Sequence, residues 1–397
     1  MNLPLTGVRV LDLTNVLAGP FCTYQLALMG AEVIKIEQPG RGDLARRLGA
    51  DPEAAKRGMG ASFVAVNCGK QSVTLDLKHK DGKTLLKRFA AQADVLVENF
   101  RPGVMDRLGL GYTVLSEVRP SLIYCAISGF GMDGPFAQRP AYDQIVQGAS
   151  GVMSITGDET SAPLRVGYPV ADTVSGLTAA FAVAAALVDA RQTGRGRCID
   201  VSLLEATLAT MGWVVSNYLN AQVEPSPMGN SNFTAAPSGT FRSGKGLINI
   251  SANEDKQYAA LCDVIGRLDL KMDVRFCDRQ ARKANRAALT TELEPALQTR
   301  SAAAWEALLI EAGVPAGQVL TVPEILNHEQ VQSRGFIKAF KVPEGDQRVT
   351  RCGFRFLDAN PEPATPAPVL SADTRAWLER LGCTTDEIEQ LMKEHVL

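Results

Sequence analysis

The passage spanning residues 166–188 constrains the fold most, because Asp172 is its only charged residue. After Thr173 the passage is rich in glycine and alanine and predicts a buried helix, with Thr173 or Ser175 as its N-cap. Asp172 would then lie at or just before the helix N-terminus, where backbone N–H groups and the helix dipole favour a carboxylate. Such a carboxylate either caps the helix or acts as a nucleophile, and the passage alone leaves both open.

The N-terminal third alternates short apolar runs with helical periodicity. Residues 8–13 and 33–36 are suited to buried strands, and residues 21–29 are suited to a helix between them. This order is a βαβ unit, which implies parallel strands with helices on their faces. The same patterns predict a helix at 80–91 and further strands at 73–77, 94–97 and 122–127. The sequence therefore predicts an α/β fold with a parallel sheet.

Glycine, proline or polar residues follow four of these strands, at 18–20, 37–43, 98–103 and 128–135. Because parallel strands end at the same edge of a sheet, we expect these segments to line one crevice, where such sheets bind ligands. In the simpler interpretation they only form the turns. The segment at 37–43 contains no G-x-G-x-x-G dinucleotide fingerprint. The loop at 37–43 is either suited to a phosphate-bearing ligand or a plain exposed turn.

The composition of the chain changes after a predicted turn and strand at 194–201 and a predicted helix at 203–220. Residues 221–237 lack periodicity and are rich in Pro, Ser, Asn and Gly, which is typical of a linker. Beyond it, the patterns predict a smaller α+β domain and a tail: a strand at 247–251, helices at 255–266, 285–298, 301–312, 322–327 and 385–394, a turn at 314–317 and a strand-like segment at 347–356.

Composition excludes several classes of protein. Lys plus Arg (41) nearly balances Asp plus Glu (43) in the 397 residues, so the net charge of -2 favours neither nucleic acid nor a membrane surface as the main partner. The eight cysteines lie singly and there are three histidines, which suggests neither a disulfide framework nor a zinc site. With no signal-like N-terminus and no apolar run of membrane-spanning length, we expect a soluble cytoplasmic protein.

An ordered set of motifs resembles the family III CoA transferases, which include formyl-CoA transferases and α-methylacyl-CoA racemases. The resemblance covers nearly the whole chain, and each motif alone is weak, but the set is specific. The motifs are Val10-Leu-Asp-Leu-Thr with Leu17-Ala-Gly-Pro20, Gly30-Ala-Glu-Val-Ile-Lys-Ile-Glu37, Glu98-Asn-Phe-Arg-Pro-Gly103, Ser128-Gly-Phe-Gly with Gly134-Pro135, Tyr142-Asp143, and the Asp172 stretch.

The resemblance implies a large Rossmann-like domain, formed by the N-terminal half and the C-terminal tail, with a smaller domain inserted between them. In this chain the expected limits are 1–220 for the large CoA-binding domain, 221–237 for a linker, 238–325 for the small domain, and 326–397 for a linker and the returning C-terminal segment. The family also implies an interlocked homodimer, with the active site between the large domain of one chain and the small domain of the other.

In the family, the residue that matches Asp172 is the catalytic aspartate. Its carboxylate attacks an acyl-CoA thioester to give an acyl-aspartyl anhydride and CoA thiolate, which then forms an aspartyl-CoA thioester. CoA and acyl-CoA are substrates, and neither a metal nor a permanently bound cofactor is implied. The expected function is CoA transfer between an acyl-CoA and a carboxylic acid. The alternatives are acyl-CoA racemisation or epimerisation, and CoA binding without catalysis.

By motif position, Asn99, Phe100 and Arg107 match residues that contact CoA, and the loop from Gln38 to Arg41 matches one near the adenine. Formyl-CoA transferases carry an arginine at the position of Gln38, and we expect Arg41 to take over its role. They also carry a glutamine at the position of Leu17, in the substrate pocket, and a glycine-rich loop that is not found in this chain. These departures argue against formyl-CoA and oxalate as substrates. Residues 12–20 look closer to transferases that act on dicarboxylic acids.

Tyr142 separates transfer from racemisation. In the family's racemases a histidine precedes the matching aspartate and exchanges the α-proton of the acyl-CoA, a task suited to imidazole. A phenol has an ordinary pKa of about 10 and is a poor base for that step. Tyr142 is therefore expected either to contact CoA or to pack in the core, and CoA transfer is favoured over racemisation.

Overall fold

The computed structural model describes residues 3–343 and 345–397, and the chain forms two units. The first unit contains Met1–Val152, Arg165–Glu224 and Gln330–Leu397. The second contains Met153–Leu164 and Pro225–Glu329. Residues 153–164, which the sequence analysis left in the large domain, belong to the second unit, where the Gly229 N–H donates to the Gly157 carbonyl over 2.7 Å.

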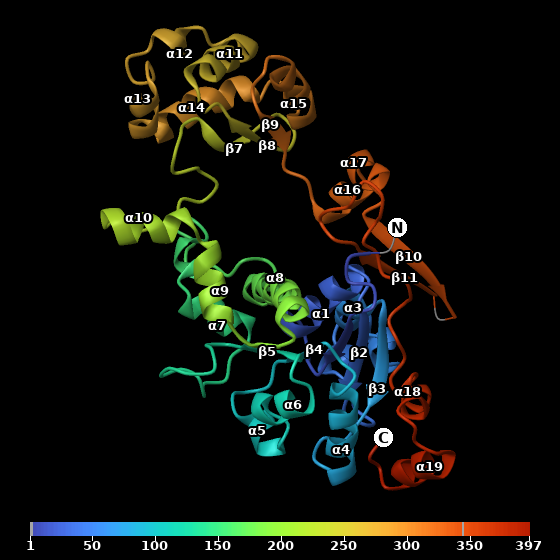
Figure 1. Ribbon diagram of the computed structural model, residues 1–397. Coiled ribbons are helices and arrows are strands. Elements are labelled where there is room, and N and C mark those ends of the chain that lie inside the picture. Colours follow the sequence, from blue (N-terminus) through green and yellow to red (C-terminus); the bar gives the residue numbers. More distant parts are fainter. Residues whose placement is uncertain (1–2, 344) are drawn as a thin grey trace. The chain divides into compact units, whose positions relative to one another are not determined.

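The first unit is built on a six-stranded parallel sheet with the order β3-β2-β1-β4-β5-β6 (Figure 1). The strands are β1 (Arg9–Asp12), β2 (Glu32–Glu37), β3 (Lys70–Thr74), β4 (Val95–Glu98), β5 (Ile123–Ser128) and β6 (Cys198–Ser202). This is the order of doubly wound nucleotide-binding sheets, and it reverses direction between β1 and β4. The predicted α/β fold with a parallel sheet is confirmed.

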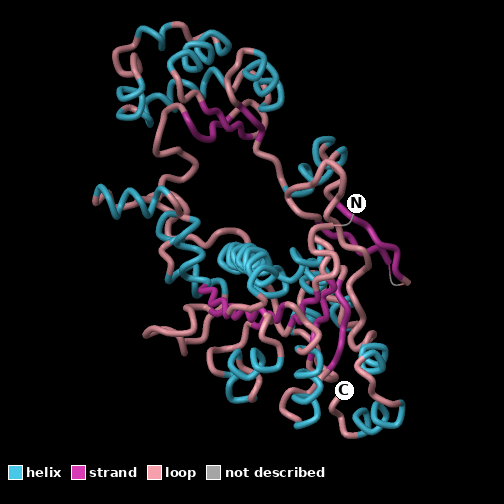
Figure 2. Tube along the Cα trace, in the orientation of Figure 1, coloured by secondary structure: helices cyan, strands magenta, loops and turns pink. Residues whose placement is uncertain are grey.

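Helices cover both faces of this sheet, interspersed with loops along the chain (Figure 2). The α-helices of the first unit up to residue 224 are α1 (Ala18–Leu28), α2 (Pro52–Lys56), α3 (Ala61–Asn67), α4 (Lys80–Ala90), α5 (Val104–Leu108), α6 (Tyr112–Val118), α7 (Asp143–Ala149), α8 (Val170–Thr193), α9 (Leu203–Thr210) and α10 (Trp213–Ala221). The 3-10 helix η1 (Leu44–Arg47) also belongs to this unit, and η2 (Val152–Ile155) crosses the boundary between the two units.

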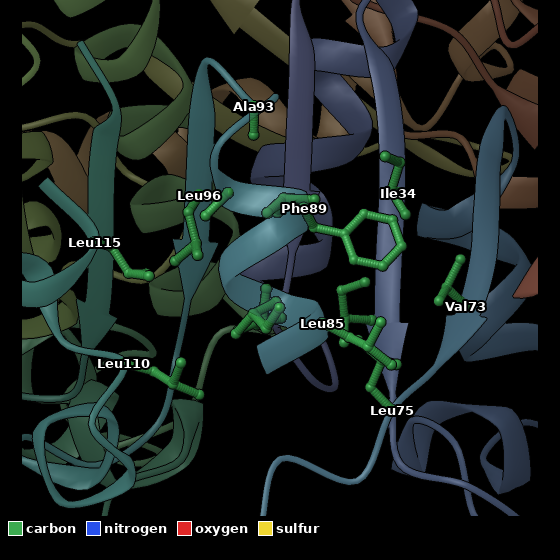
Figure 3. Packing of buried hydrophobic residues seen from close by; sticks show 14 of the residues in the cluster. Ile34, Val73, Leu75, Leu85, Phe89, Ala93, Leu96, Leu110 and Leu115 are labelled. Atoms are coloured by element: carbon green, nitrogen blue, oxygen red, sulfur yellow. The ribbon is translucent and has the colours of Figure 1, made fainter. Parts of the chain in front are cut away.

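Side chains alternate between two cores because successive strand residues point to opposite faces. On one face, Ile34 packs with Leu85 and Phe89 of α4 (Figure 3). Leu11 belongs to the same core. On the other face, Val10 and its neighbours pack against α1 and α8. The central strands β1 and β4 are therefore buried on both sides, as their apolar runs predict, whereas Cys198 and Asp200 of the edge strand β6 are exposed.

The small residues of α8 let it approach α1 closely. A Cβ on Gly176 would lie 2.6 Å from the Ala18 carbonyl oxygen, so only glycine fits at this contact. Among the described residues, α8 alone is long and apolar enough to cross a membrane by length and composition, although 44% of its most apolar window is buried. A buried core helix passes the same test. This corrects the expectation that no apolar run reaches that length.

The C-terminal segment completes the first unit. It contains α17 (Glu329–Ser333) at the unit boundary, a hairpin of β10 (Ile337–Val342) and β11 (Gly345–Thr350), and the helices α18 (Thr374–Arg380) and α19 (Thr385–Lys393). Trp377 and Ile388 join the core on the α4 face. The Tyr24 hydroxyl donates to the Thr350 carbonyl over 2.7 Å. The tail thus completes the apolar cover of the sheet.

The second unit has its own core around a three-stranded antiparallel sheet. Its elements are β7 (Ser238–Arg242), β8 (Leu247–Ser251), β9 (Ala316–Gln318), α11 (Asp255–Ile265), α12 (Asp269–Met272), α13 (Arg279–Ala284), α14 (Arg286–Leu297), α15 (Ala302–Glu311) and α16 (Val322–Asn327). The turn expected at 314–317 is wrong, because Ala316 and Gly317 pair with β8.

In the first unit, the single helix expected at 203–220 is also wrong, since it breaks at Gly212, whose φ is 51°.

Candidate active site

A cavity of about 410 Å³ opens at the carboxyl ends of β1, β4 and β5, and we call it the Asp172 cavity. The strand order reverses beside β1, where open α/β sheets leave room for a ligand. The residues lining it are Asn15, Val16, Leu17, Ala18, Leu44, Asn99, Phe100, Arg101, Pro102, Ile127, Ser128, Gly129, Ala137, Arg139, Pro140, Ala141, Tyr142, Asp172 and Leu203. All of them belong to the first unit, and three of the predicted strand-end segments contribute.

Asp172 lies in the first turn of α8, whose N-cap is Pro169. The expected caps are wrong, because the Thr173 hydroxyl donates back to Pro169 O (2.8 Å) and the Ser175 hydroxyl to Ala171 O (2.6 Å). Once inside the helix, these hydroxyls bond the carbonyl one turn earlier rather than the free N–H groups.

The side chain that caps α8 comes from Asp143, at the start of α7. Its Oδ1 accepts from the backbone N–H of Ala171 (2.9 Å) and of Asp172 (3.3 Å). Gln147 donates to Asp143 Oδ2 over 2.7 Å and fixes the carboxylate. Asp143 therefore performs the capping role that the sequence analysis left open for Asp172. Its signal in the sequence was the Tyr142-Asp143 motif, which by itself does not reveal a partner.

Asp172 is left without a partner of its own. Within the part of the chain that the structure describes, no donor hydrogen-bonds its carboxylate, and the residue is half-buried. Burial first, and then the negative charge of Asp143, raise the pKa of Asp172 to about 7. A carboxylate with no cationic partner at the wall of a cavity is free to attack a bound electrophile.

Residues 15–17, here called the pocket turn, connect β1 to α1 and line the same cavity. The Asn99 side chain holds the turn by accepting from the Asn15 N–H (2.9 Å) and donating to the Asn15 carbonyl (2.8 Å). Among the described residues, the N–H groups of Leu17 and Ala18 donate to no acceptor. These groups at the start of α1 are suited to an anionic oxygen in the cavity.

A second cavity of about 270 Å³ lies beside the first and shares Asn15 and Phe100 with it. Gln38 lines this second cavity. Arg41 and Arg107 are exposed and line neither of the two, but the Arg107 guanidinium lies against Gly103, where an added Cβ would be 3.2 Å from Nη1. Of the predicted site residues, Leu17, Asn99, Phe100, Tyr142 and Asp172 are therefore brought together in the Asp172 cavity.

Tyr142 is 69% exposed, so packing in the core is wrong for this side chain. None of the three histidines lines either cavity. Arg101 and Arg139 do line the Asp172 cavity, and the sequence analysis named neither as a site residue. In the sequence, only their position after predicted strand ends indicated that these two arginines could belong to the site.

Glu98 is a buried carboxyl group beneath the cavity wall. It accepts from the Phe100 N–H over 2.7 Å and from the Tyr124 hydroxyl over 3.2 Å. Burial raises the pKa of Glu98 to about 7 despite these bonds, so two carboxyl groups near this site titrate close to neutrality.

One group of possible metal ligands occurs among the described residues. The ligand atoms of His79, Asp81 and Glu394 lie within 4.8 Å of one another, but none of these residues lines the Asp172 cavity. All eight cysteines are free.

Comparison with known proteins identifies the family. The family model described as CoA-transferase family III matches residues 5–374. The chain belongs to this family. An acetyl-CoA:oxalate CoA-transferase of Acetobacter aceti is 41% identical over 335 residues, which are 84% of this chain and 85% of that protein. A succinyl-CoA:glutarate CoA-transferase of Mus musculus is 35% identical over 396 residues, 99% of this chain and 90% of that protein.

Solved structures agree with this assignment. The crystal structure of a CAIB/BAIF family protein from Brucella suis has a TM-score of 0.85 at 35% identity and covers 96% of this chain and 100% of that chain. This CoA-transferase of family III therefore shares its fold, and CoA thioesters are the substrates of its relatives.

Proposed function

We propose that this family III CoA-transferase moves CoA between an acyl-CoA and a dicarboxylic acid through a covalent intermediate on Asp172. The observation that carries the proposal is the unpaired carboxylate of Asp172 on the wall of a cavity at the switch point of the sheet. Relatives named for oxalate and glutarate support a dicarboxylic acid as donor or acceptor.

The proposed chemistry balances without a further reactant. Asp172 attacks the thioester carbonyl, the carbon–sulfur bond breaks, and CoA leaves as the thiolate. The thiolate attacks the Asp172 carbonyl of the anhydride, releasing the donor acid as its carboxylate and leaving aspartyl-CoA. The acceptor carboxylate then attacks aspartyl-CoA, which releases the CoA thiolate and forms a new anhydride. The thiolate attacks the acceptor's carbonyl in that anhydride, which gives the new acyl-CoA and frees the Asp172 carboxylate. Each step exchanges one activated acyl group for another, so the protein mainly has to position the reactants and stabilise oxyanions.

The N–H groups of Leu17 and Ala18 support this role, because they have no acceptor among the described residues and both residues line the Asp172 cavity. Arg101 and Arg139 are the cationic side chains that line the cavity. A dicarboxylic acid brings a second carboxylate, for which a guanidinium is a matching donor. We assign the second carboxylate to these two arginines within the proposal.

We assign the binding of CoA to Gln38, Arg41, Asn99, Phe100, Arg107 and Tyr142. The two cavities share a wall at Phe100, so an extended ligand can pass from the thioester end at Asp172 toward Gln38. Arg41 and Arg107 are exposed cations suited to the phosphates of the nucleotide end.

Replacing Arg107 tests this assignment. Arg107→Ala should weaken CoA-ester binding by roughly 1 to 3 kcal/mol, the range for charged hydrogen bonds, as measured by isothermal titration calorimetry. Arg348→Ala removes another exposed arginine, on β11, and should leave the affinity unchanged. Equal affinity in wild type and the Arg107 variant would instead assign Arg107 to the structure of α5.

We also propose that the enzyme is a homodimer. Large apolar side chains are exposed on α8 and α10: Leu177, Phe181, Val188, Trp213, Tyr218 and Leu219. So many exposed apolar groups of this size on two helices are unusual for a monomer. The proposal predicts a solution mass of twice 42.5 kDa by light scattering. Phe181→Asp, at a side chain that is 76% exposed, should shift the mass toward the monomer, whereas Met392→Asp on α19 should not.

A further inference from the structure

The pocket turn contains a backbone outlier. Val16 has φ of 68°, in the left-handed region that β-branched residues rarely adopt. The residue lines the Asp172 cavity between Asn15 and Leu17. Strain of this kind persists only where surrounding groups impose it, and it is concentrated at functional sites.

Two side chains from other strand ends impose this conformation. The Asp43 carboxylate accepts from the Val16 N–H over 3.0 Å, and it also caps η1 through the Ala45 N–H over 2.9 Å. Asn99 bonds both backbone groups of Asn15, so the two residues before Leu17 are fixed from both sides.

Asp43 is itself held by a buried lysine. Lys35 Nζ lies 2.9 Å from Asp43 Oδ2, and both side chains are 0% exposed. Lys35 Nζ also donates to the Thr14 carbonyl over 2.8 Å, just before the pocket turn. Burial alone would raise the pKa of Asp43, but Lys35 and the backbone N–H donors hold it below its ordinary value.

Stability alone does not explain this pair. Replacing a buried ion pair with well-packed apolar residues is often neutral or stabilising. Lys35 also lies 3.8 Å from the Asp12 carboxylate. The remaining hydrogen bonds of the two side chains are to backbone groups at Thr14, Val16 and Ala45, next to the starts of α1 and η1.

We propose that Lys35 and Asp43 are positioning residues for acyl transfer, which hold Val16 in its left-handed conformation so that the N–H groups of Leu17 and Ala18 keep their place in the Asp172 cavity. The inference rests on the proposed function. Neither residue touches the substrate in this account. Both act through the pocket turn.

The test removes the pair without leaving a buried charge. In Lys35→Met/Asp43→Leu, Asp12 retains Lys70 at 2.9 Å. We expect kcat for CoA transfer to fall about tenfold or more, since small misplacements near the reacting atoms are costly, while KM for the acyl-CoA changes less than about threefold. Adding Val16→Gly should restore kcat by at least about threefold, because glycine adopts the left-handed turn without the pair.

Asp94 offers a matched control at the opposite end of the sheet. Its carboxylate likewise accepts a backbone N–H, from Arg9 over 2.9 Å, and pairs with Arg119 over 3.3 Å. Asp94→Leu should lower Tm and leave kcat unchanged. A drop in kcat equal to that of the Lys35/Asp43 variant would show that general loosening of the fold is the cause, and would overturn the inference.

The remaining outcomes are also decisive. Unchanged kcat in the double variant, or no recovery on adding Val16→Gly, overturns the positioning role. If the double variant does not fold, two single variants test whether the backbone at Val16 is strained. Val16→Gly should have a higher Tm than Val16→Ala, and the reverse order would contradict the strain on which the inference depends. A wild-type enzyme that transfers no CoA would overturn the proposed function itself, which separates the two failures.

Discussion

Asp172→Ala should abolish CoA transfer in a protein that still folds. The carboxylate is the proposed nucleophile, and its removal should lower kcat on the order of 10⁴-fold or more, as for other groups that act covalently. Donor acyl-CoA alone should add CoA to the peptide of the wild-type protein that contains Asp172, and hydroxylamine should remove it. Mass spectrometry of the digested protein checks both.

Asp189 provides the control for this variant, because it is a second aspartate of α8 and pairs with Arg197 over 2.6 Å. Asp189→Ala should retain transfer and should not change the CoA adduct on Asp172. Appreciable transfer by a folded Asp172→Ala protein, or an adduct on another peptide, would contradict the covalent role.

The stability of the enzyme should respond to pH through Asp172. Its pKa is raised to about 7 in the folded protein, so the folded state favours the protonated form. The wild type and Asp172→Asn should therefore be similar in stability below about pH 4. As pH rises from there through 7, the wild type should lose stability relative to the variant. The rise in the pKa of Asp172 from 3.8 to about 7 limits this loss of unfolding free energy to roughly 4 kcal/mol. Because Asp172 is partly exposed, we expect a loss of about 1 to 3 kcal/mol.

Urea unfolding of both proteins at pH 5 and pH 8 measures this difference. The comparison subtracts Glu98, whose pKa is also raised to about 7 and which is present in both proteins. The difference in stability between the wild type and Asp189→Asn should be the same at both pH values, because the pair with Arg197 keeps the pKa of Asp189 below its ordinary value. A gap between wild type and Asp172→Asn that is the same at both pH values would refute the buried, unpaired state of Asp172.

Local patterns were sufficient to predict most elements of the fold. The apolar run at 33–36 lies within β2 (Glu32–Glu37), and the helical spacing at 80–91 corresponds to α4 (Lys80–Ala90). Both signals come from residues within one element. The helix at 203–220 was wrong because its break depends on the left-handed backbone of Gly212, and glycine is also tolerated within helices.

Position at strand ends was sufficient to place Asn99 and Phe100 near one cavity, because parallel strands end at one edge of a sheet. Asp172 was assigned to the site by the family resemblance and not by a strand end. It was not sufficient to identify their hydrogen-bond partners. The roles assigned to these residues remain predictions that the variants above test.

The sequence by itself determined that a nearly uncharged helix carries one carboxylate, that the sheet is parallel, and that polar residues gather at its carboxyl edge. Only the tertiary structure decided which hydrogen-bond partners hold the residues of the site in place. Asp143 lies 29 residues from Asp172, Asp43 lies 27 residues from Val16, and Asn99 lies 84 residues from Asn15. Such partners have no periodic signal, because the fold rather than the local chain brings them together, and the strain at Val16 exists only once they have met.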